Sequence, residues 1–188
     1  MDAQELLTAD HNRFRGLFAR FKSAEKDANT STMLGMAGKI VDGLDIHTRI
    51  EEELYYPAIA GLGDEVHDLV AEGIQEHHVA KQLMEELSTV APAGEEWVAK
   101  VTVLIEAVEH HAEEEEKEMF PEVAGAMPAA ERDGLGARMM RRKRELGAPE
   151  PAIDLTKEEL LSKAREQEIP GRSKMSKEEL ALTVDPRG

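Results

Sequence analysis

Cysteine is absent from this chain of 188 residues, which excludes a disulfide framework, a thiolate zinc site, a cysteine-ligated iron–sulfur cluster and a cysteine nucleophile. Aromatic residues make up only 4% of the sequence, and this scarcity disfavours β-sandwiches and stacking platforms for single-stranded nucleic acids. No apolar run approaches the roughly 18 residues that a membrane-spanning helix needs, and the first residues contain no apolar signal region. We therefore expect a soluble, cytoplasmic protein with no membrane partner.

Charged residues, by contrast, make up 33% of the chain, and residues that favour helices, such as Ala, Leu, Glu, Lys and Met, are plentiful. The charge divides the chain in two. Residues 1–127 carry a net charge of −17, whereas residues 128–188 carry a net charge of +1. An acidic body of this kind should repel DNA and anionic membranes, and it can supply carboxylates to a metal. The nearly neutral remainder is expected to be a separate unit with a separate task.

Residues 1–127 have the periodicity of four long helices, with apolar side chains repeating at helical spacing. Polar residues at 29–32 and a proline- and glycine-containing stretch at 91–94 interrupt the pattern, and Gly61 and Gly63 mark the turn between them. Long helices joined by short turns form an antiparallel up-down bundle. We therefore predict an all-α fold with a four-helix bundle at 1–127, its helices at about 2–27, 33–60, 64–90 and 95–126.

The remainder of the chain is expected to hold three smaller parts. An additional helix at 128–147 carries a cluster of basic residues, and a proline- and glycine-containing linker at 148–153 follows it. In the tail at 154–188, Thr156 and Ser176 each stand three positions before a glutamate, which is the capping box of a helix start. The tail is therefore predicted to be a small helix–loop–helix.

A histidine–glutamate motif occurs twice in the bundle region. The segments HTRIEEELYYP at 47–57 and HAEEEEKEMFP at 111–121 align on their final proline, with histidine ten residues and glutamate six residues before it. A histidine and a glutamate four residues apart lie on one face of a helix, one turn apart, and can bind one metal centre together. The two motifs are His47/Glu51 and His111/Glu115.

The helices that precede these motifs repeat as well, because Asp10-His11 in the first matches Glu76-His77 in the third. The bundle region is therefore a duplicated helix pair, and the middle of one helix in each pair faces the middle of the next. Four histidines and two glutamates are expected to converge in the bundle core. The candidate metal ligands are His11, His47, Glu51, His77, His111 and Glu115.

Helical phase separates these histidines from their neighbours. His77 shares a stripe with Val70 and Ile74 and should point inward, whereas His78 and His110 lie among charged residues and should face water. A single core histidine is more often hydrogen-bonded than metal-bound. A carboxylate on an apolar stripe, however, is costly unless it is paired or bound to a metal, and here two occur at duplicated spacing. The whole set therefore favours a metal centre over a structural role.

With these motifs, residues 5–127 resemble the hemerythrin-like family, whose bacterial branch is often called HHE cation-binding. The family pattern places an acidic–histidine pair on the first and third helices, and a His-x-x-x-Glu motif on the second and fourth. The resemblance implies a four-helix bundle that holds two iron ions with an oxo or hydroxo bridge, and with Glu51 and Glu115 as bridging carboxylates. The stretch IEEELYYPAI is particularly similar to actinobacterial members, for which it implies peroxide-linked chemistry.

One position departs from the oxygen carriers of this family, which have a second histidine four residues after the first on the third helix. Lys81 stands there in this chain. The resemblance then assigns His11 and His47 to one iron and His77 and His111 to the other, and it leaves more coordination positions open. Open positions favour reaction with an oxidant over reversible storage of O2. Nitrogen and oxygen ligands suit iron, with manganese and zinc as alternatives by ligand type.

Two tyrosines and one further glutamate are candidates for supporting roles. Tyr55 lies one helical turn after Glu51 and is the candidate for a hydrogen-bond donor or redox-active phenol beside the ligands. Tyr56 is expected to pack at the kink that Pro57 introduces by removing a backbone donor. In the acidic run at 113–116, Glu116 at most supports a ligand from outside.

The tail is similar to the SAP or transcription-terminator N-terminal type of helix–loop–helix, and the loop Ile-Pro-Gly-Arg-Ser-Lys-Met carries the resemblance. Such modules often touch nucleic acids. The basic residues here are few, chiefly Arg172, Lys174 and Lys177, and the body is acidic, so contact with nucleic acid or protein through the tail should be weak. A partner-docking or purely solvated tail is the alternative.

The leading functional interpretation is a non-haem di-iron protein that reacts with or senses O2 or hydrogen peroxide, with catalase-like turnover as one form of that reaction. The alternatives are an O2 or iron carrier without catalysis, and a protein that binds nitric oxide or delivers iron.

Overall fold

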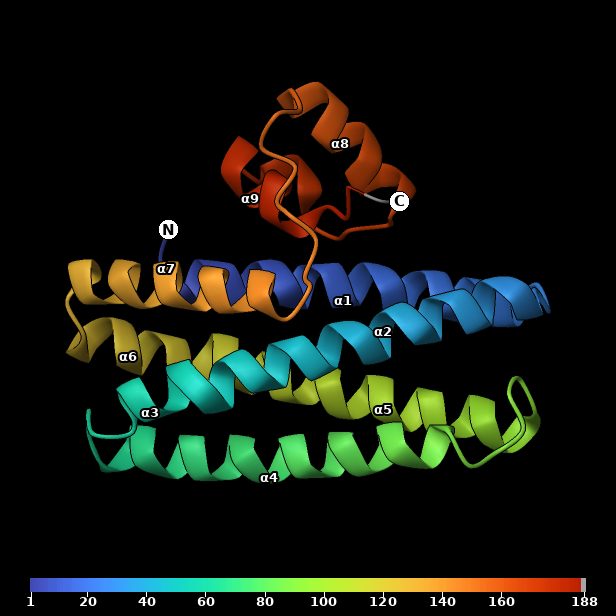
Figure 1. Ribbon diagram of the computed structural model, residues 1–188, viewed down its shortest axis with the longest axis horizontal. Coiled ribbons are helices and arrows are strands. Elements are labelled where there is room, and N and C mark those ends of the chain that lie inside the picture. The colour runs from blue at the N-terminus through green and yellow to red at the C-terminus, as the bar shows by residue number, and fades with distance from the viewer. Residues whose placement is uncertain (187–188) are drawn as a thin grey trace.

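The computed structural model describes residues 1–186, and every regular element within them is a helix. Four long helices run up and down beside one another (Figure 1). They are α1 (Ala3–Lys26), α2 (Thr30–Ile50), α4 (Asp64–Leu87) and α5 (Glu95–Glu114). The predicted all-α bundle is thus confirmed. No helix in this described part of the chain is both long and apolar enough to cross a membrane.

The second and fourth helices of the bundle continue through a π-helical turn. After α2 come η1 (Glu51–Tyr55) and α3 (Tyr56–Ile59), and after α5 come η2 (Glu115–Met119) and α6 (Phe120–Ala126). In each turn the N–H of the residue before the proline donates to the carbonyl group five residues earlier. Proline has no N–H and its ring disturbs the α-helical ladder, so a wider turn accommodates it. The kink expected at Pro57 is therefore a π turn that begins at the glutamate of the motif.

Side-chain caps fix the starts of the first two helices. Asp2 accepts a hydrogen bond from the N–H of Gln4, and Glu5 accepts one from the N–H of Asp2, which makes a capping box. Asn29 caps α2 by accepting a hydrogen bond from the N–H of Thr32. The break predicted at 29–32 is therefore shorter than expected, because α2 already begins at Thr30.

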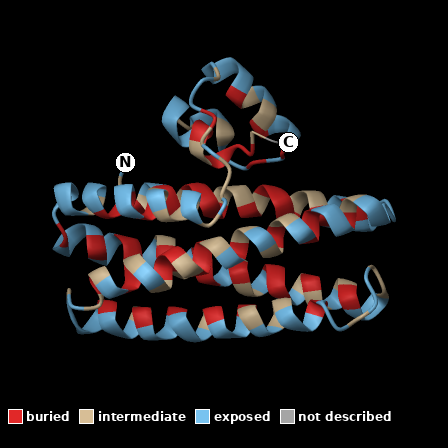
Figure 2. Cartoon of the chain, in the orientation of Figure 1, coloured by how far each residue is buried: buried red, intermediate tan, exposed pale blue. Residues whose placement is uncertain are grey.

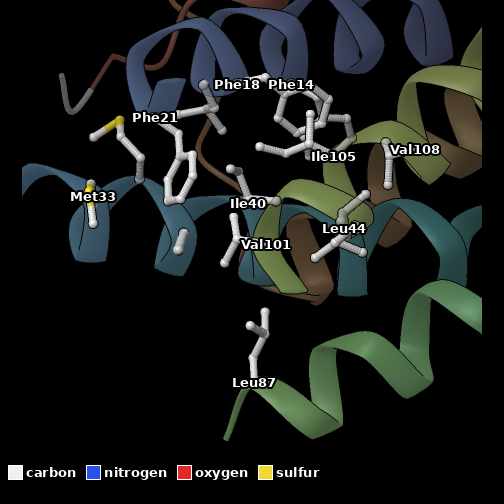
Figure 3. Packing of buried hydrophobic residues seen from close by; sticks show 14 of the residues in the cluster. Phe14, Phe18, Phe21, Met33, Ile40, Leu44, Leu87, Val101, Ile105 and Val108 are labelled. Atoms are coloured by element: carbon white, nitrogen blue, oxygen red, sulfur yellow. The ribbon is translucent and has the colours of Figure 1, made fainter. Parts of the chain in front are cut away.

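The bundle core consists of two apolar clusters with a polar layer between them. Buried positions line the inner faces of the long helices (Figure 2). In the first cluster, Phe14, Phe18 and Phe21 of α1 pack with Ile40 and Leu44 of α2 (Figure 3). The second cluster lies at the other end and includes Leu6, Leu7, Ile50, Tyr55, Tyr56, Ile59 and Phe120. Along each long helical stretch, the buried polar residues stand between the two clusters.

One inward position predicted from helical phase is wrong. Ile74 is 41% exposed, whereas Gly73 is buried on the inner face of α4 together with Val70 and His77. A Cβ atom at Gly73 would lie 2.8 Å from the hydroxyl oxygen of Tyr56, so only glycine lets that ring approach the helix. The inward stripe of α4 passes through Gly73, and a hydrophobicity pattern misses it because glycine has no side chain.

The additional helix, α7 (Ala129–Glu145), packs along α1 on the outside of the bundle (Figure 1). Leu135 and Met139 of this helix are buried in the second apolar cluster. Gly136 permits a close approach to the start of the chain, because a Cβ atom there would lie 2.5 Å from the carbonyl oxygen of Met1. This helix is therefore an integral part of the bundle packing.

The tail forms a small helical unit with its own apolar core. Its elements are α8 (Lys157–Glu166), the 3-10 turn η3 (Arg172–Lys174) and α9 (Lys177–Thr183), and both predicted capping boxes are present. The unit sits against α1 (Figure 1). Gly16 of α1 allows this contact, because a Cβ atom there would lie 2.6 Å from the carbonyl oxygen of Gln167. The tail is therefore docked on the bundle and not held by its linker alone.

The three basic residues considered for nucleic-acid contact differ in their surroundings. The guanidinium group of Arg172 donates to the carbonyl oxygen of Ile169 within the tail. Lys174 and Lys177 are exposed. The basic surface that the tail offers is therefore small, and weak nucleic-acid or protein contact through it stays a prediction.

Candidate metal centre

The polar layer between the two apolar clusters contains six residues from four helical stretches, each at most 6% exposed. They are His11 on α1, His47 on α2, His77 on α4, His111 on α5, and Glu51 and Glu115 at the starts of the two π turns. The structure thus brings together every candidate ligand that the duplicated sequence pattern predicts.

The carboxylate of Glu51 lies between histidines from the two halves of the duplicated bundle. Its Oε1 is 3.3 Å from Nε2 of His47, and its Oε2 is 3.2 Å from Nε2 of His77. The Nε2 atoms of His77 and His111 face each other at 3.1 Å. Glu51 is therefore placed to contact two separate cations at once.

Glu115 takes the equivalent place in the second motif. Its Oε2 is 3.4 Å from Nε2 of His11 and 3.9 Å from Nε2 of His111. The ligand atoms form two groups, within each of which all atoms lie within 4.8 Å of one another. These groups are His11, His47, Glu51 and Glu115, and Glu51, His77 and His111. Each group offers the mixture of imidazole nitrogen and carboxylate oxygen that binds divalent transition metals.

Four of these ligand atoms are buried and have no hydrogen-bond partner among residues 1–186. They are Nε2 of His11, both carboxylate oxygens of Glu51 and Oε2 of Glu115. Buried polar atoms in folded proteins nearly always have a partner, and a buried carboxylate without one is costly. A cation between these atoms would satisfy all four, so the residues fit a metal.

The other ring nitrogen of each histidine faces an acidic side chain. The distance from Nδ1 to the carboxylate oxygen is 2.9 Å for His11, 3.3 Å for His47, 3.0 Å for His77 and 2.7 Å for His111. When Nδ1 keeps its proton and donates a hydrogen bond to the carboxylate, the lone pair of the neutral imidazole is on Nε2 and points toward the centre. Two such lone pairs facing each other repel unless they share a cation. The acidic partners are, in the same order, Glu116, Asp10, Glu52 and Glu76.

Comparison with known proteins places this geometry in a family. Residues 2–123 match the family model described as the hemerythrin HHE cation binding domain. The chain belongs to the hemerythrin HHE family. It is 34% identical over 154 residues to an uncharacterised protein of Mycobacterium tuberculosis, Rv2633c, with 79% of this chain and 90% of the relative covered. A relative from Mycobacterium bovis gives the same values.

The fold of this HHE protein also matches a crystal structure. That structure is a hemerythrin HHE cation binding domain-containing protein from Mycobacterium kansasii, a homologue of Rv2633c. The match has a TM-score of 0.66 and 24% sequence identity, and it covers 98% of this chain and 99% of the other. The shared fold therefore extends beyond the bundle, over α7 and the tail.

In this HHE domain, the acidic partners of the histidines follow the duplication. Asp10 on α1 and Glu76 on α4 each precede a ligand histidine, and each contacts the histidine of the next bundle helix. Glu52 and Glu116 each follow the glutamate of a motif, and they contact His77 on α4 and His11 on α1, respectively. A supporting role was expected for Glu116 but not for Glu52, although two adjacent glutamates in both motifs carry the signal.

Lys81, which the sequence pattern marks only as the place of a missing histidine, has a role of its own in the HHE domain. Its ammonium group donates to both carboxylate oxygens of Glu52, at 2.6 and 2.7 Å. Arg15 stands four residues after His11, as Lys81 stands four residues after the third-helix histidine, and it donates to both oxygens of Glu116 at 2.9 and 3.0 Å. Lys81 and Arg15 are therefore equivalent cations, and each holds the acidic partner of one ligand histidine.

The additional helix α7 contributes a third cation. Lys143 donates to Oδ1 of Asp10 at 2.5 Å, while Oδ2 of Asp10 faces His47. Burial alone would raise the pKa of Asp10, but Lys143 and His47 outweigh burial and hold the pKa below its ordinary value. A helix outside the matched residues 2–123 thus supports a histidine of the HHE domain.

The tyrosine whose hydroxyl group reaches the candidate ligands is Tyr56. It donates to Oε1 of Glu115 at 3.1 Å and lies 3.5 Å from Nε2 of His77. The hydroxyl group of Tyr55, the tyrosine predicted for this role, instead accepts a hydrogen bond from Gln4. The π turn explains the difference, because it aligns residues five apart, whereas an α-helical phase aligns residues four apart.

The two glutamates of the centre have opposite pKa shifts. Burial and the neighbouring charge of Glu115 raise the pKa of Glu51 well above its usual value. Burial also acts to raise the pKa of Glu115, but the imidazoles of His111 and His11 outweigh it and lower that pKa. Burial and the repulsion of His111 lower the pKa of His77 to about 2, so its imidazole is neutral, as metal ligation requires.

A cavity of about 20 Å³ adjoins the four histidines. Its other walls are mainly apolar and include Leu44, Ala80 and Val108. A cavity of this size holds about one water-sized molecule.

The three remaining histidines, His67, His78 and His110, are exposed, so the phase prediction for His78 and His110 is confirmed.

Proposed function

We propose that this chain is a hemerythrin-like protein that holds two iron ions between its six convergent side chains and reacts with O2 or hydrogen peroxide. The observation that supports it best is the set of four buried ligand atoms without a hydrogen-bond partner in the described chain. These atoms lie in two overlapping groups that share Glu51. Two overlapping groups suit two cations better than one, because a shared carboxylate can bridge them.

The ligands divide between the two ions by distance. His11 and His47 would hold one ion, and His77 and His111 would hold the other. Glu51 contacts a histidine of each pair, and so does Glu115, so both carboxylates are proposed as bridges. Six protein ligands shared between two ions leave coordination positions that the protein does not fill, which suits reaction with a small oxidant.

Iron ions, when bound here, supply the redox chemistry toward O2 or peroxide. The protein controls which molecules reach them. The cavity of about 20 Å³ beside the histidines has room for one small molecule, such as O2 or hydrogen peroxide. Its apolar walls, among them Leu44 and Ala80, keep bulk water away.

Tyr56 supplies a proton donor beside the ligands. Burial and the charge of Glu115 raise the pKa of Tyr56 well above its usual value, so its phenol group keeps its proton. The hydroxyl group holds Oε1 of Glu115 and lies 3.5 Å from Nε2 of His77. It is therefore proposed to orient the carboxylate and, by turning its single O–H away from Glu115, to donate a hydrogen bond to a small molecule bound on this side.

Metal analysis of natively purified protein, with visible spectra before and after addition of peroxide, tests the proposal. We expect two irons per chain and evolution of O2 from peroxide at an oxygen electrode. One zinc or manganese per chain would refute the di-iron assignment. A stable, reversible adduct of the reduced protein with O2, without gas evolution from peroxide, would assign the chain to the carriers. Glu51→Ala should lose iron, and His78→Ala is the matched control that should retain it.

A further inference from the structure

A second group of side chains of the metal-ligating types lies on the outer face of α4 and α5. Ligand atoms of Glu76, His110 and Glu114 all lie within 4.8 Å of one another, and we call these three residues the outer group. Nε2 of His110 is 3.3 Å from Oε1 of Glu114 and 3.9 Å from Oε1 of Glu76. The side chain of His110 is 66% exposed, so the outer group is open to solvent.

A narrow cavity of about 10 Å³ lies between the outer group and the metal centre. Glu72, Glu76 and Glu114 line it toward the surface, and His111 and Glu115 line it toward the core. Glu76 contacts both sides, because its Oε1 faces the surface histidine and its Oε2 accepts a hydrogen bond from Nδ1 of His111. Glu115, at the inner end, belongs to the metal centre, where its buried Oε2 lies 3.9 Å from Nε2 of His111 and has no hydrogen-bond partner in the described chain.

The charge around the centre makes this side different from the others. Three of the four carboxylates that face ligand histidines form an ion pair with a fixed positive charge. The cations are Arg15, Lys81 and Lys143. The fourth, Glu76, pairs with no lysine or arginine among residues 1–186, and the same holds for the other two glutamates that line the cavity. Fixed positive charges repel an approaching metal ion, whereas uncompensated carboxylates attract it.

We propose that the outer group, together with Glu72, is an uptake site that captures a divalent transition-metal cation and passes it through the cavity to His111 and Glu115. This inference rests on the proposed function, because it requires a centre that holds metal. One imidazole and several carboxylates suit such a cation. Glu76 belongs both to the outer group and to the surroundings of His111, so a captured cation moves inward while one carboxylate stays in contact with it.

Stopped-flow uptake of Co²⁺ by chelator-treated full-length protein, followed by cobalt absorption, tests the uptake site. The double variant Glu72→Gln/Glu114→Gln removes two charges at the mouth of the cavity and leaves all six candidate ligands intact. Its uptake rate at low ionic strength should fall about five- to tenfold, and the salt dependence of the rate should weaken. The amount of Co²⁺ bound at equilibrium should equal that of the wild type.

The matched control is Glu109→Gln/Glu113→Gln, which removes two exposed charges of the same helix α5 that pair with Lys22 and Lys117. Its uptake rate should equal that of the wild type. Equal rates for the two double variants would overturn the uptake site. Loss of Co²⁺ at equilibrium in Glu72→Gln/Glu114→Gln would overturn it too, because these residues would then belong to the centre itself. Failure of the wild type to bind Co²⁺ would instead refute the metal centre, before any variant is compared.

Discussion

Replacing Glu51 by glutamine should stabilise the metal-free protein, whereas the same change at Glu115 should destabilise it. The two side chains hold equivalent places in the two motifs, but their surroundings differ. Neither oxygen of Glu51 has a hydrogen-bond partner among residues 1–186, and burial raises its pKa. Glu115 accepts a hydrogen bond from Tyr56 and lies among imidazoles that lower its pKa. Negative charge is therefore unfavourable at Glu51 and favourable at Glu115 unless metal is bound.

The expected size follows from the cost of burying polar groups. Removing the charge from a buried group without a partner recovers roughly 2 kcal/mol. For a chain of this length, 1 kcal/mol shifts Tm by about 2–4 °C, so metal-free Glu51→Gln should melt about 4–8 °C above the wild type. Glu115→Gln weakens a hydrogen bond to a charged acceptor, worth about 1.5–3 kcal/mol, and should melt about 3–12 °C below it.

The stabilisation by Glu51→Gln should depend on pH in a defined direction. A raised pKa means that the folded protein binds this proton more tightly than the unfolded chain does. The stability of the metal-free wild type should therefore fall as pH rises from the ordinary glutamate value of 4.5 toward the raised value. This group contributes a slope of at most about 1.4 kcal/mol per pH unit. The advantage of Glu51→Gln should grow across that range and then level off.

Thermal melts of chelator-treated protein, from mildly acidic to neutral pH, measure both effects. Metal should reverse the order, because Co²⁺ at about 1,000 times its Kd stabilises the wild type by about 4 kcal/mol and a variant that lacks a ligand by less. The electrostatic argument is refuted if metal-free Glu51→Gln melts below the wild type at neutral pH, or if the difference between them is the same at every pH.

Three further predictions address other parts of the molecule. His77→Ala should lose metal and stability, because it removes a ligand and leaves a buried cavity, whereas metal analysis of the control His78→Ala should give the wild-type value; an empty site in the control would contradict the assignment. Tyr56→Phe should slow the reaction with peroxide in stopped-flow spectra and Tyr55→Phe should not, so the opposite result would assign the supporting role to Tyr55. Gly16→Ala should detach the tail, because its Cβ atom would lie 2.6 Å from a backbone oxygen, and limited proteolysis should then cleave the linker at 148–153 faster than in the control Gly38→Ala, where a Cβ atom meets nothing within 4 Å.

The position of the candidate metal centre could be predicted from the sequence because it depends on two robust regularities. Antiparallel hairpins of equal length bring the middles of their helices together, so motifs placed at mid-helix must meet. One residue along an α-helix turns the side chain to a different face, which separates the buried His77 from the exposed His78. Neither regularity requires knowledge of the loops or of the tail.

The supporting residues could not be predicted in the same way, because their roles depend on contacts that no local pattern reports. The backbone hydrogen bond of the π turn spans five residues instead of four. This brings Tyr56 rather than Tyr55 beside the ligands. Lys81 acquires its role only through Glu52, which lies on a different helix. Lys143 reaches Asp10 from a helix 133 positions away in the sequence. Such partners become visible only when the helices are packed.

The two halves of the duplicated bundle match in their ligands but differ around them. In the alignment on the prolines, Phe120 corresponds to Tyr56. Phe120 stacks on the ring of His11 at 6.1 Å and brings no polar atom, whereas Tyr56 stacks on His77 at 5.5 Å and brings its hydroxyl group to Glu115. In the first half, the ring that covers the ligand His11 is therefore purely apolar. In the second half, the ring that covers His77 also provides a hydrogen-bond donor.

The charges differ between the halves in the same sense. The acidic partners of His11 and His47 are both held by fixed cations. In the other pair, Lys81 holds the partner of His77, but Glu76, the partner of His111, has no such cation and faces the outer group and the cavity that opens there. Positive charge and apolar packing disfavour exchange of metal at the position of His11 and His47. Carboxylates and a phenol donor favour it at the position of His77 and His111. We therefore expect the two metal positions to be inequivalent. Metal should load and exchange first at His77 and His111, and a small oxidant should react on that side.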